Sequence, residues 1–559
     1  MRTKNLSRHS KWWTLPVLAV TLFFSSCQKQ ELTKEAEKNL TESSLENSNL
    51  FSRTGDGIPF RGGTNMLLGE LKKNPYTIAN MTTAWQNLAS RGINFRGETS
   101  VYTTHLYVKF KPQNSDQYEQ LHNDSTLGFS DYPIESTVIQ NGDYYHDPSL
   151  PDSVPTYQYT SVKADYQFPK NIPYEIIDKL YIPETDNVFQ YETGGTNDLF
   201  VNQLLNQAYT QTGNYEDTIA LDNQPTTTAS RYTPGGQIRV FDTRLQRWIG
   251  MEGVRVQARR WFVIYNGYPD FNGNYRMAHN FTRPCNYSIW FATNRFSVRH
   301  NVVNTTFWVN GPHVSGDWNY DLNNEYQRFA GHVFRGAYRY NHKDIGGLQR
   351  PYLPWRQVYV AVDGSGNSQG VNWVVLPVIR VWRYNGSFEH NSDDVFSTTC
   401  HETGHTSHVR RMGLGNGGVI QYWQVSKMLQ ESWPIAIEWH LTHIEYADRG
   451  IANYGEFNYI IPAPNTPGYP NEEAYQYWFK SLEPDYTTIY INLVDNFNES
   501  TVYMAGASPL DIVTGYTFSQ IETVIIPYSY GLSSLSTQLK SNKPAGVTDL
   551  QIDNLLEAY

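Results

Sequence analysis

The chain has 559 residues, more than a single hydrophobic core accommodates, so we expect about three domains. Its formal net charge is −10 at pH 7 and it has no run of basic residues, which argues against a nucleic-acid-binding protein. The 41 Tyr, 25 Phe and 15 Trp residues are typical of β-rich folds, although aromatic side chains also provide platforms for sugars.

The first residues have the features of an export signal. Basic residues precede an apolar stretch at 12–24 (WWTLPVLAVTLFF), which is too short to span a bilayer as a stable helix. The stretch ends in FSSC and resembles a bacterial lipoprotein signal (1–27), which implies acylation of Cys27 and an outer-membrane or cell-surface location. An ordinary cleaved signal with an incidental cysteine is the alternative. Residues 28–58 are polar and charged, and we expect a flexible tether.

Residues 59–195 predict an N-terminal domain of mixed helices and strands, α/β or α+β, without a catalytic motif. Residues 74–92 (NPYTIANMTTAWQNLASRG) are typical of a helix that ends at a glycine. Residues 104–112 (THLYVKFKP) alternate like a strand. The region lies N-terminal to the motif described below. A prosegment or an inhibitory module would occupy the same position in the chain. Residues 196–232 have the composition of a linker.

Residues 233–299 predict a small β-sandwich module. GVRVQARRW (253–261) and NYSIWF (286–291) are predicted strands, and DFNGNY (270–275) contains an Asn-Gly pair typical of a tight hairpin turn. Several short strands at this spacing indicate a sandwich. The module resembles the transthyretin-like and carboxypeptidase-regulatory-like domains that are appended to exported enzymes.

Two cysteines follow Cys27, so a four-cysteine metal site is excluded. An exported protein could join Cys285 and Cys400 as a disulfide. Two buried thiols are an equal alternative, and the sequence does not distinguish them.

The third region, residues 300–559, contains an H-E-x-x-H motif at 401–405. Residues 393–412 carry helix signals, with two aspartates at the start, two arginines at the end and a glycine afterwards. The motif therefore lies inside a predicted helix, which is the context it requires.

The helix geometry explains the chemistry of this motif. Positions i and i+4 are about 40° apart, so His401 and His405 point the same way and both imidazoles can bind one cation. Glu402 is rotated by about 100° from His401, which keeps it off the metal but within reach of a water that the metal activates. Glu402 is therefore the expected general base.

A catalytic zinc site takes a third protein ligand and keeps one open position. The metzincin pattern would require glycine and histidine where this chain has His408 and Arg411. Residues 427–446 (KMLQESWPIAIEWHLTHIEY) instead offer three glutamates spaced by seven, roughly on one helix face. These are Glu431, Glu438 and Glu445.

Together the two motifs resemble the zincin metallopeptidases, and among them the gluzincin branch. In several such families the third ligand is the first residue of an E-[SG]-x-A-like segment, and a second acidic residue follows seven positions later. ESWPIAIE (431–438) is similar. The resemblance implies Zn²⁺ bound by the two histidines and Glu431, with Glu438 holding a ligating histidine. Pro434 departs from the pattern, because proline bends or starts a helix, and it leaves Glu438 as an alternative ligand.

Two further zincin features are expected. A strand near 378–384, interrupted upstream by a proline and therefore at a sheet edge, would bind extended substrate by strand addition. A donor to the oxyanion should also be present. The candidates are Tyr446, His440, His443, Tyr503 and Tyr516.

We therefore predict a multidomain α+β protein with a zincin-like α+β catalytic domain at 300–559. The predicted function is a zinc-dependent endopeptidase that acts on a protein or glycoprotein and is bound to the membrane by a lipid anchor. The alternative is a catalytically inactive cell-surface protein that binds glycan or host protein through its β modules.

Overall fold

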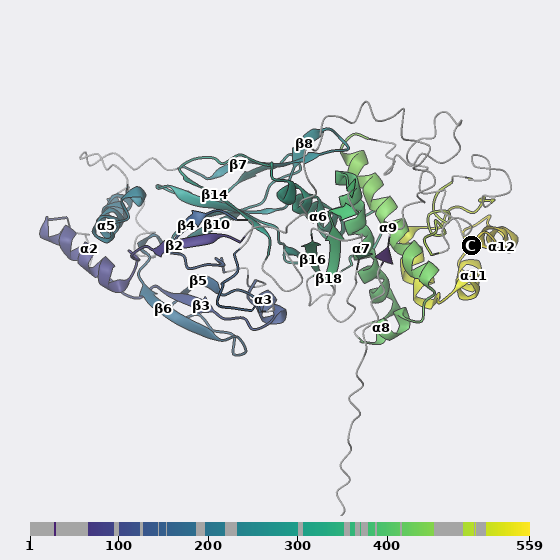
Figure 1. Cartoon of the computed structure of the whole chain (residues 1–559), viewed down its shortest axis with the longest axis horizontal. Coiled ribbons are helices and arrows are strands. Elements are labelled where there is room, and N and C mark those ends of the chain that lie inside the picture. The colour runs from purple at the N-terminus through teal and green to yellow at the C-terminus, as the bar shows by residue number, and fades with distance from the viewer. Residues whose placement is uncertain are drawn as a thin grey trace, which may run out of the picture.

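The computed structural model has a mixed α+β fold with several sheets (Figure 1). The residues that it describes are 27–28, 65–93, 100–122, 124, 127–142, 145–151, 154–185, 196–218, 232–299, 306–351, 358–363, 369–370, 378–385, 388–413, 416–451, 485–496, 498 and 510–559. The predicted signal and tether lie outside them, except that Cys27 and Gln28 form the two-residue strand β1. Within the described residues, none of the helices has the length and apolar character that a transmembrane span needs.

The N-terminal region combines helices with antiparallel sheets. Helix α2 (Ile78–Ser90) and strand β3 (His105–Phe110) confirm the two elements predicted there. The other elements are β2 (Leu67–Leu71), α3 (Ser115–His122), β4 (Ser136–Gln140), β5 (Gln158–Lys163), β6 (Tyr174–Leu180) and η2 (Pro183–Thr185). Strand β2 pairs with β4, and β3 lies between β5 and β6, all antiparallel. The antiparallel pairing makes this region α+β, one of the two descriptions predicted for it, and not α/β, since the α/β class uses parallel strands.

The prediction of a linker at 196–232 is wrong for its first part. Residues Thr196–Thr212 form helix α5, which packs against α2 and is followed by the short helix η3 (Tyr215–Asp217). Phe200 of α5 contacts Trp85 of α2 with ring centroids 4.9 Å apart. Leu204 and Ala208 continue the buried stripe at helical spacing. Polar residues between these positions obscured the periodicity in the sequence.

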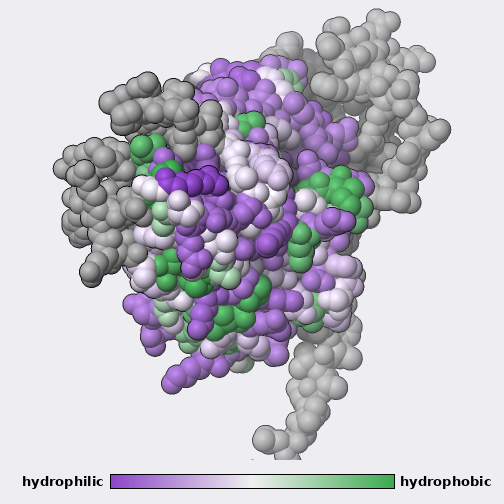
Figure 2. All heavy atoms as spheres, turned by 90° about the vertical axis from the view of Figure 1, so that its left-hand side faces the viewer, coloured by the Kyte–Doolittle hydropathy of each residue, from purple (hydrophilic) through white to green (hydrophobic). Residues whose placement is uncertain are grey.

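The N-terminal end of the molecule presents a mostly hydrophilic surface with separate apolar patches (Figure 2). Exposed apolar side chains in this region include Leu67, Leu71, Ile139, Tyr174 and Ile176, all on strands.

Two sheets form the β-rich centre of the chain. One has the order β10-β9-β12-β14, and the other has the order β11-β7-β15 with β8 paired to β7. Their strands are β7 (Gly235–Asp242), β8 (Arg247–Gly250), β9 (Arg255–Arg260), β10 (Val263–Gly267), β11 (Asn274–Arg276), β12 (Cys285–Trp290), β14 (Trp308–Val314) and β15 (Tyr320–Leu322). Ile238 and Val240 of one sheet share a core with Val256 and Ile289 of the other. The predicted strands at 253–261 and 286–291 are confirmed.

The predicted boundary at residue 299/300 does not coincide with these sheets. Strands β14 and β15 lie beyond the boundary yet pair with β12 and β7. Strand β13 (Phe296–Arg299) lies before it and pairs in parallel with β16 (Val358–Asp363). Strand pairing across the sequence is not visible in local patterns, which explains the difference.

The C-terminal region combines a three-stranded parallel sheet, in the order β13-β16-β18, with a group of helices. Its other strands are β17 (Gln369–Gly370), β18 (Val378–Trp382), β19 (Tyr384–Asn385) and β20 (Phe388–Glu389). Its helices are α6 (Glu325–His342), α7 (Ser392–Met412), α8 (Asn416–Tyr422), α9 (Lys427–Asp448), α10 (Phe518–Gln520), η6 (Ile521–Ile525), η7 (Ile526–Tyr528), α11 (Leu532–Ser541) and α12 (Asp549–Leu556). Among the described strands β18 is at the sheet edge, as predicted, and α7 packs beside it.

Helix α7 lies between α6 and α9 (Figure 1). A Cβ atom on Gly336 of α6 would lie 2.7 Å from the carbonyl oxygen of Phe396, so glycine permits the close approach of α6 to α7. Cys400 of α7 and Cys285 of β12 are both buried, and no disulfide joins these two described residues.

Candidate metal centre

Helix α7 carries the H-E-x-x-H motif and has defined ends. The carboxylate of Asp394 accepts a hydrogen bond from the backbone N–H of Asn391 at 3.0 Å, which caps the first turn. Arg410 and Arg411 occupy the last turn, and Gly413 follows with φ +148°. Both motif histidines and Glu402 are buried, because α7 is covered by neighbouring helices. The helix predicted at 393–412 is confirmed.

His401, His405 and Glu431 form a cluster that can hold a metal ion, with one potential ligand atom from each residue within 4.8 Å of the others. Glu431 Oε2 lies 3.7 Å from His401 Nε2 and 3.4 Å from His405 Nε2. A tetrahedral ion with bonds of about 2.0–2.1 Å places its ligand atoms about 3.3 Å apart. The two distances from Glu431 are close to this value, so the three residues could hold a metal ion.

Glu431 reaches the cluster because α7 and α9 pack closely. A Cβ atom on Gly404 would lie 3.1 Å from Pro434 Cα and 3.2 Å from Ile437 Cδ1. A glycine between the two histidines therefore lets the α9 backbone approach α7. The prediction chose Glu431 as the third residue of the site, and the structure places it there.

Pro434 lies inside α9 without ending it. Proline has no N–H, so the carbonyl of Gln430, four residues earlier, lacks its helical partner. The imidazole of His408 lies near the backbone of Gln430, and its Nδ1 atom is buried without a hydrogen-bond partner among the described residues. Burial lowers the pKa of His408 to about 3, so its ring is neutral. His408 takes no place in the cluster.

The outer nitrogens of both histidines face oxygen atoms. Glu438 Oε2 lies 3.4 Å from His401 Nδ1, and the hydroxyl of Tyr422 lies 3.0 Å from His405 Nδ1. An Nδ1–H directed at these oxygens leaves the lone pair of each Nε2 facing Glu431. Glu438 thus occupies the orienting position predicted for it. Tyr422, from α8, was not predicted, because nothing in the local sequence marks it.

Glu402 lies beside the cluster, with its Oε2 atom 4.0 Å from His405 Nε2. This oxygen is buried and has no hydrogen-bond partner in the described part of the chain. Burial raises the pKa of Glu402 to about 7, although the two histidines lower it. A buried acceptor without a partner is costly, and a water held by a cation at the cluster would satisfy it.

The electrostatics of the cluster favour a cation. Burial lowers the pKa of His401, but Glu438 and Glu431 outweigh this effect and raise it to about 10. Burial raises the pKa of Glu431, but His405 and His401 hold it well below its ordinary value. Three buried carboxylates surround two imidazoles, so a divalent ion would neutralise an excess of negative charge and displace the imidazole protons.

Four of the five predicted oxyanion donors have other partners. The hydroxyl of Tyr446 donates to Asp242 at 3.0 Å, and that of Tyr516 donates to the carbonyl of Leu539 at 2.8 Å. His443 Nδ1 is 2.6 Å from the carbonyl of Trp439, and His440 packs on Phe518. The fifth, Tyr503, is outside the described residues. The buried ring of Tyr486, which was not predicted, lies 6.5 Å from that of His401.

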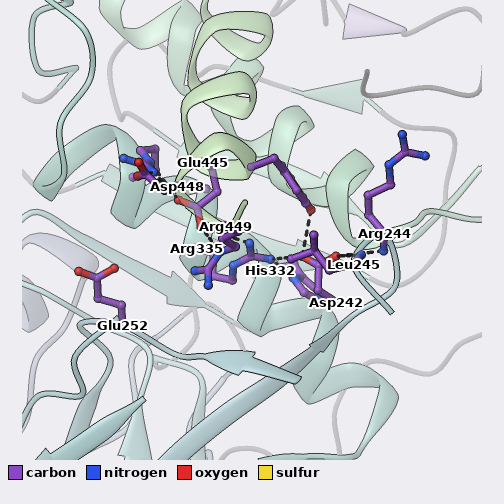
Figure 3. Close-up of polar contacts among 12 residues, drawn as sticks. Asp242, Arg244, Leu245, Glu252, His332, Arg335, Glu445, Asp448 and Arg449 are labelled. Atoms are coloured by element: carbon purple, nitrogen blue, oxygen red, sulfur yellow. Dashed lines mark hydrogen bonds and ion pairs between the residues drawn. The ribbon is translucent and has the colours of Figure 1, made fainter. Parts of the chain in front are cut away.

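Glu445, the third glutamate of the heptad series, belongs to a separate buried network (Figure 3). Arg335 of α6 lies between two carboxylates, donating to Asp242 at 2.9 Å and to Glu445 at 3.2 Å. Arg339 and Arg449 also donate to Glu445, at 2.9 Å and 2.7 Å. The network links β7, α6 and the end of α9.

Comparisons with known proteins identify no relative: no family model matches the chain, and neither a curated protein nor a solved structure is significantly similar to it. The evidence for this site is therefore the H-E-x-x-H sequence and the geometry of His401, His405 and Glu431.

Proposed function

We propose that this protein is a zinc-dependent metallopeptidase with a gluzincin-like catalytic domain in residues 300–559. The observation that carries the proposal is the set of 3.4 and 3.7 Å spacings between Glu431 and the Nε2 atoms of His405 and His401. These spacings suit tetrahedral zinc, and the buried Glu402 lies beside them.

Each residue of the cluster has a role in the proposed reaction. His401, His405 and Glu431 hold the ion, while Glu438 and Tyr422 fix the two rings. Zinc, when bound, supplies a Lewis acid that lowers the pKa of water and polarises the peptide carbonyl. Glu402 takes the proton from the attacking water and passes it to the leaving amine. A carboxylate that is buried beside the ion can both accept and return a proton.

The proposed substrate is a protein or glycoprotein that binds in an extended conformation. Strand β18 lies at the edge of the described sheet and next to α7, where a substrate strand could pair with it. The proposed location is the cell envelope, at the outer membrane or cell surface, through a lipid on Cys27. Labelling with a radioactive fatty acid in cells, compared with Cys27→Ala, tests the anchor.

The first test is zinc content, measured by elemental analysis of residues 28–559 purified without added metal. We expect about one zinc per chain, absent in His401→Ala and retained in the control His279→Ala, which changes an exposed histidine. No zinc in the wild-type chain, even after reconstitution, would overturn the proposal.

The second test separates metal binding from hydrolysis. Glu402→Gln should keep its zinc and lose cleavage of a peptide library, while Glu70→Gln, which changes an exposed glutamate, should cleave normally. A wild-type chain that binds zinc but cleaves no peptide would favour the alternative of a catalytically inactive binding protein.

A further inference from the structure

We propose that the β-sandwich has a binding site for a neutral pyranose sugar, in a surface pocket beside Tyr268. The pocket has a volume of about 530 Å³ and is bordered by β7, β11 and the loop before β15. This volume lies within the range of small-molecule sites, roughly 300–1,000 Å³. The site shares no residue with the metal centre and does not depend on the proposed peptidase function.

Tyr268 supplies an apolar platform at the edge of the pocket. It is 60% exposed, so much of its ring contacts no protein atom. The negative face of an aromatic ring attracts the C–H groups on one face of a pyranose, which carry partial positive charge. Pro269 follows and restricts the backbone of Tyr268 to extended conformations.

The polar wall of the pocket suits hydroxyl groups. Arg276 and Asp317 line it, with Arg276 Nη2 3.3 Å from Asp317 Oδ2, and both side chains are exposed, at 61% and 47%. An ion pair this exposed contributes little to stability. The amides of Gln237, Asn274 and Asn319 complete the wall. Amides both donate and accept hydrogen bonds, as sugar hydroxyls do. The positive charge of Arg276 and the negative charge of Asp317 cancel, which favours a ligand without net charge.

The two sides of the pocket are held in place before any ligand binds. In the turn before β11, Asp270 Oδ1 accepts hydrogen bonds from the backbone N–H groups of Asn272 and Asn274, both at 2.9 Å. On the other side, the hydroxyl of Tyr275 donates to the carbonyl of Trp318 at 2.9 Å. A Cβ atom on Gly236 would lie 2.1 Å from that carbonyl, so only glycine permits this approach. Such a preorganised frame reduces the cost of binding.

A peptide is a weaker fit to the same pocket. Strand β11 provides only three residues of sheet edge, Asn274–Arg276, for main-chain pairing. The exposed groups around the pocket are side chains that offer both donors and acceptors. Such groups suit the hydroxyls of a sugar better than they suit the backbone of an extended peptide.

The test is binding of the full mature chain to a printed array of neutral oligosaccharides that end in glucose, mannose, galactose or N-acetylglucosamine. The strongest ligand is then titrated by calorimetry. We expect Tyr268→Ala and Asp317→Ala each to weaken binding about tenfold or more, and Tyr268→Phe to retain it, because the ring face is preserved. Tyr215→Ala is the matched control, since Tyr215 is 65% exposed on η3.

The inference is independent of the metal centre, so Glu402→Gln should bind sugar as the wild-type chain does. Failure of the peptidase proposal would leave this result unchanged. Absence of binding to every sugar at millimolar concentration would overturn the inference. Binding that survives Tyr268→Ala, or that appears only with a peptide library, would overturn it too.

Discussion

Gly404 lies where the two helices that carry the candidate metal ligands approach each other, and its replacement tests the geometry of the site. In Gly404→Ala the new Cβ atom would lie 3.1 Å from Pro434 Cα, whereas ordinary contacts begin at 3.4 Å. Helix α9 must therefore retreat by about 0.3 Å or tilt, since the opposing atom belongs to the backbone. Glu431 is three residues from Pro434 and would move with it. Metal–ligand distances tolerate changes of only about 0.2 Å.

The substitution should affect metal affinity more than stability. Alanine gains up to about 1 kcal/mol over glycine inside a helix, whereas overpacking costs about 1–3 kcal/mol. The net change in the free energy of unfolding without metal is thus about 2 kcal/mol or less. Displacement of Glu431 should lower zinc affinity about 10- to 100-fold, as for other changes that misplace a ligand. Gly404→Val, with a larger side chain, should lower it further.

The assay is competition for zinc between the protein and a chelating dye, with unfolding in urea measured on the metal-free chain. Gly531→Ala is the control, because no atom lies within 4 Å of a Cβ atom at that position. Wild-type zinc affinity in both Gly404→Ala and Gly404→Val would refute the claim that the α7–α9 spacing positions Glu431.

Three further substitutions test the residues around the site. Glu438→Gln should lower zinc affinity about 10- to 100-fold in the same dye assay, because His401 loses its carboxylate partner. Tyr422→Phe should cause a smaller loss, since a hydroxyl is a weaker acceptor than a carboxylate; a loss equal to that of Glu438→Gln would contradict this ranking. Glu445→Gln should destabilise the fold by about 3–5 kcal/mol in urea unfolding, because it removes the carboxylate that three buried arginines share. Burial raises the pKa of Glu445, but Arg449 and other buried cations hold it well below 4.5, so its stabilisation is present at neutral pH and lost as pH falls below about 4.5. The stability of Glu445→Gln should therefore fall less steeply below pH 4.5, by up to about 1.4 kcal/mol per unit, and an unchanged slope would count against the network.

Elements with local signals were predicted well. Helix α7 has an acidic first turn, a basic last turn and a following glycine, and these signals act within a few residues. Helix α2, which a glycine follows closely, and strands β3, β9 and β12, which have strand-like runs, were also predicted from local patterns. The proximity of His401 and His405 also follows from local geometry, because four residues span about one helical turn.

Elements that depend on distant partners were missed or misplaced. Helix α5 looks polar in sequence, and its buried stripe becomes meaningful only against α2. Strand β14 joins the sandwich through pairing with β12. Tyr422 reaches His405 from a separate helix, and no spacing rule connects them. The position of His408 beside the backbone of α9 likewise depends on how two helices pack.

The heptad spacing of the three glutamates correctly indicated a common helix face, but each glutamate on that face has different neighbours. Seven residues advance a helix by about 10.5 Å and rotate it by only about 20°, so successive glutamates meet different neighbours along one line. Glu431 lies at the metal cluster, Glu438 at the outer nitrogen of His401, and Glu445 at the arginines of α6. Helix α6 also approaches α7 closely at Gly336. Both ligand-bearing helices are therefore supported by α6, while the contact at Gly404 sets the distance between them.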